Sequence, residues 1–180
     1  MDSALVLLIL IVSLGALGFV LSRRNAKEAK KIGAKIYTVA VHLYGIPGMG
    51  EKELVSLFFA DDKLVIKSKK KTFDLFYNKL TAIKAVKQTD LIQKDRSVIG
   101  RGVAGGLLLG PAAAIVGGLS AVGRKKNVKG ELLIINYLPS QGEEPKVIIF
   151  DLQKLSNPKR IEKFVQGKRP ELIEPDYVTL

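Results

Sequence analysis

The stretch Leu54-Val-Ser-Leu-Phe-Phe-Ala60, Asp61-Asp62, Lys63-Leu-Val-Ile-Lys-Ser68 decides the fold class of this chain. Two runs rich in aromatic and β-branched residues flank a pair of acidic turn residues, and this pattern predicts a β-hairpin. The same period of two extends from Ile36 to Lys87 and includes a further strand at Thr72-Phe-Asp-Leu-Phe-Tyr77. The first half of the domain is therefore predicted to be an antiparallel sheet.

Strands resume further along the chain. Gly130-Glu-Leu-Leu-Ile-Ile-Asn-Tyr-Leu138 and Lys146-Val-Ile-Ile-Phe150 are both predicted strands. Asn157 followed by Pro158 indicates a helix start, with an N-cap and then a proline at the first helical position. The helix is expected to carry Ile161, Phe164 and Val165 on one face and to end at Gly167.

Antiparallel strands followed by one C-terminal amphipathic helix resemble the pleckstrin-homology-like fold, and most closely its small bacterial membrane-anchored members. The resemblance covers about residues 36–166. It is carried by Val55–Ile66, Phe73–Ile83, Leu132–Tyr137 and the closing helix. It implies an α+β domain, an antiparallel β-barrel or sandwich with a C-terminal helix, that binds ligands and is not an enzyme. No headgroup-binding motif of the family matches, so the resemblance implies no ligand site.

A transmembrane anchor is predicted at the N-terminus. Residues 3–22 carry no charge, and twenty helical residues rise about 30 Å, the thickness of the hydrocarbon core. A cleaved signal peptide carries its positive charge before the apolar run, whereas Arg23, Arg24, Lys27, Lys30 and Lys31 follow it here. The positive-inside rule then predicts a single-pass cell-membrane protein with its N-terminus outside and its main domain cytoplasmic.

The expected organisation has four parts. Residues 1–22 are the anchor, 23–35 a basic juxtamembrane linker that is helical or flexible, 36–166 the β domain, and 167–180 a C-terminal tail. Residues 100–124 interrupt the β domain with a Gly/Ala-rich apolar insert, which ordinary members of the family lack.

The insert is predicted to be a helical hairpin. Gly102, Gly106 and Gly110 recur every four residues, with Gly117 beyond Pro111, and small residues at such spacing allow helices to pack closely. Pro111 divides the segment into halves too short to span a bilayer. The hairpin is expected to dip into the leaflet or pack on anchor helices. The alternatives are a hairpin packed on its own domain and a flexible loop.

Composition narrows the partners. The formal net charge is +12 and the isoelectric point about 9.8, which favours polyanions. Binding to anionic lipid headgroups requires no assumption beyond the predicted anchor, whereas binding to nucleic acid requires a further one. The aromatic residues Phe58, Phe59, Phe73 and Phe76 alternate as core residues would, so stacking on bases is not favoured. Headgroup contact is predicted for the basic residues nearest the apolar segments: Arg23, Arg24, Lys27, Lys30, Lys31, Arg101, Arg124, Lys125 and Lys126.

Catalytic chemistry has little support. The chain has no cysteine and one histidine, His42, in a predicted strand, where a surface or core role is more common than catalysis. No nucleophile or phosphate-binding motif is present, and no metal or cofactor is expected. Three non-enzymatic hypotheses remain: a binding module at anionic lipid or a protein partner, an oligomerising or pore-like membrane protein assembled through the hairpin, and a membrane-tethered nucleic-acid binder.

Overall fold

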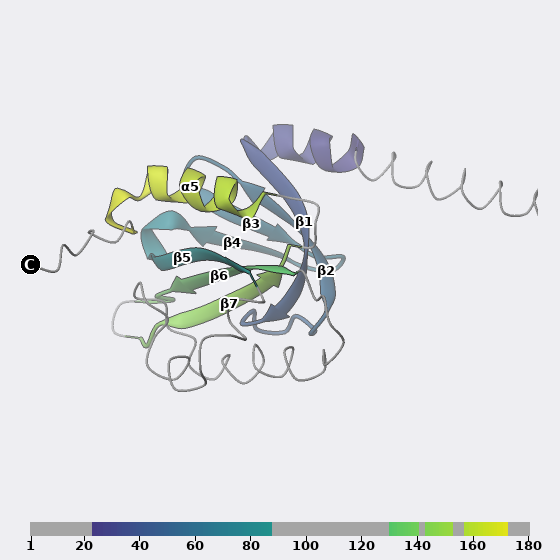
Figure 1. Cartoon of the computed structure of the whole chain (residues 1–180). Coiled ribbons are helices and arrows are strands. Elements are labelled where there is room, and N and C mark those ends of the chain that lie inside the picture. Colours follow the sequence, from purple (N-terminus) through teal and green to yellow (C-terminus); the bar gives the residue numbers. More distant parts are fainter. Residues whose placement is uncertain (1–22, 88–129, 141–142, 153–156, 173–180) are drawn as a thin grey trace, which may run out of the picture.

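The structure is a computed structural model of the 180-residue chain that describes residues 23–87, 130–140, 143–152 and 157–172. Within these ranges an antiparallel sheet of seven strands has the order β4-β3-β2-β1-β7-β6-β5 (Figure 1). The strands are β1 (Ile36–Tyr44), β2 (Glu53–Phe59), β3 (Lys63–Lys67), β4 (Thr72–Phe76), β5 (Leu80–Lys87), β6 (Glu131–Tyr137) and β7 (Lys146–Asp151).

The predicted hairpin of residues 54–68 is present. β2 pairs with β3 from Ser56↔Lys67 to Phe59↔Leu64, and Asp61 and Asp62 are exposed in the turn between them. The predicted strands at 72–77, 130–138 and 146–150 also form. The run 78–87 begins in a short 3-10 helix, η1 (Tyr77–Lys79), and continues as β5.

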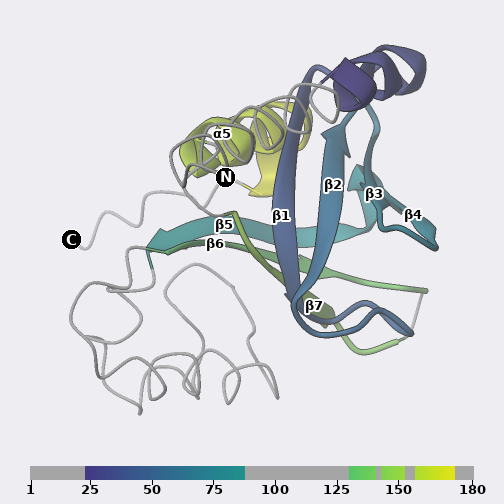
Figure 2. The same ribbon diagram turned by 90° about the vertical axis from the view of Figure 1, so that its right-hand side faces the viewer.

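The sheet folds over a main core. Figure 2 shows β1 and β2 crossing β5 and β6 at a steep angle, and side chains from both halves meet in one buried cluster. Among the described strands, β4 and β5 are the two edges and do not pair with each other. The α+β, antiparallel prediction is confirmed, but the sheet does not close into the predicted barrel. Tyr77 lies between these two edge strands in the chain, and its hydroxyl donates a hydrogen bond to the Ala60 carbonyl at 3.0 Å.

Helix α5 (Pro158–Lys168) packs on the core through Ile161 and Val165, which are both buried. Asn157 caps it as predicted, because its side-chain oxygen accepts a hydrogen bond from the Arg160 amide at 3.2 Å. Glu162 accepts a hydrogen bond from the Ala85 amide on edge strand β5 at 3.0 Å, which ties the helix to the sheet. A short 3-10 helix, η3 (Pro170–Leu172), follows α5.

A second described helix covers residues 23–32, within the segment predicted to be helical or flexible. Among the residues that the structure describes, neither helix is long and apolar enough to cross a membrane. The predicted anchor, residues 1–22, and the insert, residues 100–124, lie outside the described residues. One aromatic prediction is wrong: Phe76 is 43 % exposed on the outer face of the sheet, where the Lys63 ammonium lies 5.4 Å from its ring centre.

Candidate functional site

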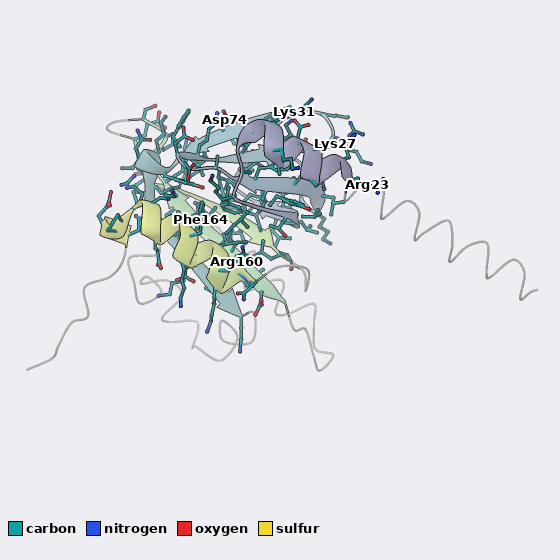
Figure 3. All side chains as sticks on the ribbon, turned by 90° about the horizontal axis from the view of Figure 1, so that it is seen from above. Arg23, Lys27, Lys31, Asp74, Arg160 and Phe164 are labelled. Atoms are coloured by element: carbon teal, nitrogen blue, oxygen red, sulfur yellow. The ribbon has the colours of Figure 1, made fainter. Side chains whose placement is uncertain are left out.

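The helix of residues 23–32 carries a basic face. Its five basic side chains are all exposed, and at 100° per residue they occupy an arc of only about 120° of the helix circumference. These residues are Arg23, Arg24, Lys27, Lys30 and Lys31. Figure 3 shows Arg23, Lys27 and Lys31 in succession along this helix. The structure therefore gathers the first predicted basic cluster on one surface.

The opposite face of the helix packs on the sheet. Ala29 is buried against Phe58 and Val65, two paired residues of β2 and β3 that point away from the main core, and Ile32 packs beside them. Phe58 also stacks on Tyr37 of β1, with ring centres 6.4 Å apart. The helix is therefore docked by its apolar side with its basic side outward.

A glycine ends the helix and turns the chain into β1. Gly33 has φ +73°, the left-handed conformation common at helix C-termini. The Gly33 amide donates to the Lys30 carbonyl at 3.2 Å and the Ala34 amide donates to the Ala29 carbonyl at 2.8 Å, which together form a Schellman motif. The Lys35 amide then donates to the Phe59 carbonyl at 2.8 Å. These bonds fix the direction of the helix relative to the sheet.

An ion pair adds to this docking. The Lys67 ammonium at the end of β3 donates to the Glu28 carboxylate on the helix, and both side chains are about one-third exposed. The hydrogen bond from Lys67 lowers the pKa of Glu28 below its ordinary value of 4.5, and the positive charge of Lys67 adds to this effect. Neither partner was singled out from sequence, because 39 residues separate them along the chain.

We expect the Glu28 carboxyl group to titrate below pH 4.5 in the folded protein. Because its folded pKa is lowered, its contribution to helix docking is present above the unfolded value and is lost as the pH falls through the folded value. Carbon-13 NMR of the side-chain carboxyl measures the midpoint. Lys67→Met should return the midpoint toward 4.5, whereas Lys63→Met, which removes the partner of Asp74, should leave it unchanged. If the titration midpoint of Glu28 is the same in the Lys67→Met variant as in the wild type, the ion pair does not form in solution.

The lysines of the β3–β4 turn divide into two groups. Lys71 donates to the Gly48 carbonyl at 3.1 Å and so supports the loop between β1 and β2. Lys69 and Lys70 are exposed in a turn held by the Ser68 hydroxyl, which accepts from the Lys70 and Lys71 amides. Lys67, the last residue of β3 before this turn, is bonded to Glu28 of the docked helix.

His42 has a structural position. It is 2 % exposed, its Nε2 accepts a hydrogen bond from the Ile46 amide at 3.2 Å, and its Nδ1 lies 3.0 Å from the Gly50 carbonyl oxygen. These partners require a neutral ring with its proton on Nδ1. Within the described residues, no group of three or more histidine or acidic side chains could hold a metal ion. His42 thus holds the β1–β2 loop.

The other predicted contact residues lie outside the described residues: Arg101, Arg124, Lys125, Lys126, Gly102, Gly106, Gly110 and Gly117. The strand ends that flank the segment containing the insert are described, however. β5 and β6 pair in antiparallel register up to Lys87↔Glu131, so residues 88–130 leave and rejoin the sheet at adjacent positions. Had the insert crossed a bilayer once, its two ends would lie on opposite sides and this pairing could not form.

No family model matches the sequence, and no curated protein matches it either. The functional evidence therefore lies in the described surface itself, whose most distinctive feature is the docked basic helix.

Proposed function

We propose that this protein is a non-enzymatic, single-pass membrane protein that presents a cytoplasmic, pleckstrin-homology-like domain to anionic lipid headgroups. The observation that carries the proposal is the basic face of the helix 23–32, which directly follows the uncharged run 3–22 and is held on the sheet. The basic residues are thereby set at the end of the proposed anchor in one fixed orientation.

The arrangement of the domain supports the family part of the proposal. The resemblance rests on antiparallel strands followed by one closing amphipathic helix, and the described residues contain both features. The described residues bring together no set of groups suited to acid–base or metal catalysis, since the single histidine is bonded to the β1–β2 loop. Binding therefore accounts for the described surface better than catalysis does.

Electrostatic attraction sets the expected free energy of binding to an anionic membrane. Each basic residue beside an anionic leaflet contributes about 1 kcal/mol, and this attraction decays within roughly a Debye length of the surface. Five such residues on one helical face can approach a flat surface together, whereas residues spread around a helix cannot. Docking matters for the same reason, because a fixed helix presents its charges without first losing conformational freedom.

The test of the proposal is charge reversal on the basic face. The chain 23–180, which contains every described contact, is mixed with vesicles of neutral lipid or with vesicles containing anionic lipid. The wild-type chain should bind the anionic vesicles more tightly than the neutral ones. Arg24→Glu, Lys27→Glu and Lys31→Glu together should weaken anionic-vesicle binding by about a hundredfold, as expected for the loss of about 3 kcal/mol.

Helix α5 provides the matched control. Its exposed residues Lys159, Arg160 and Lys163 accept the same three substitutions to glutamate. Figure 3 shows Arg160 on α5, apart from Lys27 and Lys31. Both triple variants change the net charge equally, so the comparison removes the effect of total charge, and the α5 variant should bind anionic vesicles more tightly than the variant of the basic face.

The outcomes separate the candidate partners. Equal loss of vesicle binding in both variants would mean that net charge, and not the helix face, drives binding. Tighter binding to short duplex or single-stranded nucleic acid at the same salt concentration, without preference for anionic vesicles, would replace the lipid proposal by nucleic-acid binding. Absence of binding to both the vesicles and the nucleic acid would favour a protein partner instead.

A further inference from the structure

The two edges of the described sheet differ in how they are protected. On edge strand β5 the outward-pointing amide of Ala85 donates a hydrogen bond to Glu162, so α5 is tied to that edge. On edge strand β4 the alternate residues Thr72, Asp74 and Phe76 are all exposed. Figure 2 shows β4 at the end of the sheet that lies away from α5. Of the two edges that the structure describes, β4 is therefore the one open to another strand.

The hydrogen bonds between β3 and β4 show which backbone groups face outward. At one end of the ladder the Ser68 amide donates to the Lys71 carbonyl at 2.9 Å. At the other end the Tyr77 amide donates to the Asp62 carbonyl at 2.9 Å. Bonded and non-bonded pairs alternate in an antiparallel ladder, so every second residue of β4 bonds to β3 and the residues between them face outward. The outward residues are Thr72, Asp74 and Phe76.

We propose that β4 pairs with β4 of a second copy of the chain, in antiparallel register about Asp74. An open row of backbone amides and carbonyls is a template for a further strand, and with a two-fold axis the same row serves both copies. An axis through Asp74 sets Thr72 opposite Phe76 of the partner subunit. A β-branched residue opposite an aromatic residue is a favourable cross-strand pair. The pairing covers the Phe76 ring, which is 43 % exposed in the single chain.

The position of the helix 23–32 gives the reason for a second copy. Asp74 pairs with Val65, which lies beneath this helix, so Asp74 belongs to the face of the sheet that carries the helix. Directly opposite side chains of antiparallel strands also point to one face. The two-fold axis is then perpendicular to the sheet and keeps both helices on the same side. Two chains anchored in one membrane need this arrangement, and in this step the inference rests on the proposed function.

Charge complementarity favours the same register. Lys69 and Lys70 are exposed in the turn that precedes β4, and Asp62, whose carbonyl is bonded to the residue after β4, is exposed at the opposite end. Antiparallel pairing brings each lysine turn within about 10 Å, or two strand spacings, of the acidic turn of the other copy. Asp74 then faces Asp74 of the partner subunit, but each carboxylate accepts a hydrogen bond from its own Lys63 at 2.6 Å. A parallel arrangement would set the two lysine turns against each other.

The chain contains no cysteine, so introduced cysteines test the register in the full-length protein, in mild detergent and in vesicles of neutral lipid. The Cα atoms of bonded opposite residues are about 5.5 Å apart, which is within disulfide range. Asp74→Cys chains should therefore cross-link to each other on mild oxidation. Thr72→Cys chains should not, because the two copies of residue 72 would be about 14 Å apart. A mixture of Thr72→Cys and Phe76→Cys chains should cross-link.

A proline substitution tests whether backbone groups make the contact. Asp74→Pro removes an amide that points away from β3, so the β3–β4 ladder keeps its hydrogen bonds, and proline is tolerated at such an edge position. Asp74→Ala, which also removes the carboxylate, is the matched control. Cross-linking between Thr72→Cys and Phe76→Cys chains should be lost when both carry Asp74→Pro and kept when both carry Asp74→Ala. Circular dichroism checks folding, and if Asp74→Pro does not fold, the cysteine pattern alone decides the proposal.

Three results would overturn the proposal. Equal cross-linking of Thr72→Cys chains with themselves and with Phe76→Cys chains would mean random collision or another register. Cross-linking that survives Asp74→Pro in a folded chain would mean that β4 does not pair through its backbone. Absence of cross-linking in every combination would leave the β4 edge without a second copy. None of these results depends on a preference for anionic lipid, so this proposal and the proposed function can fail separately.

Discussion

Replacement of Gly45 with alanine is expected to destabilise the protein by about 3 kcal/mol or more. Gly45 directly follows β1 with φ +101°, and an added Cβ would lie 1.8 Å from the Val147 carbonyl oxygen and 2.8 Å from the Ile148 Cα. Both atoms belong to the backbone of β7 and cannot move without disturbing its pairing. Urea unfolding followed by circular dichroism measures the loss.

Gly33→Ala and Gly167→Ala are the matched controls. Gly33 has φ +73° but no atom within 4 Å of an added Cβ, so only the conformational strain of about 1 kcal/mol remains. Gly167 lies in α5 with open space around it, and alanine there should be neutral or stabilising. Equal unfolding midpoints for Gly45→Ala and Gly33→Ala would contradict the close approach of Gly45 to β7.

The second large effect concerns two adjacent phenylalanines. Phe59 is 0 % exposed in the main core, and Phe58 is 1 % exposed beneath the helix 23–32. Each substitution by alanine should cost about 3–5 kcal/mol in the chain 23–180. The two should differ once the helix is removed, because only Phe58 depends on it for burial.

Comparison with the chain 36–180 separates the two contributions. Phe58→Ala should then cost only about 1 kcal/mol, since Ala29 and Ile32 no longer cover the ring, while Phe59→Ala should keep its full cost. Chemical denaturation of both substitutions in both chains measures the coupling between helix and sheet. A Phe58→Ala cost that is unchanged without the helix would show that the helix does not dock, and the orientation proposed for the basic face would lose its basis.

Local patterns were sufficient to predict most strands. The alternation in 54–68 and the Asn157-Pro158 cap depend on neighbouring residues, so the hairpin and the start of α5 were predicted correctly. The exposure of Phe76 was not predicted, because alternation assigns residues to two faces without saying which face is covered. For the same reason, alternation did not predict that the outer face of the sheet is buried beneath the helix 23–32 and on β6.

The order of residues was sufficient to establish the antiparallel α+β class, the basic cluster after an uncharged run, and the interruption of the predicted strands by an apolar segment. Three contacts became visible only in the folded chain: the docking of the helix 23–32 through Ala29, the ion pair between Glu28 and Lys67, and the pairing of Lys87 with Glu131. Those contacts join residues that lie far apart in the chain. Strand periodicity and helix caps arise from interactions within a few residues, whereas these contacts depend on how whole elements pack.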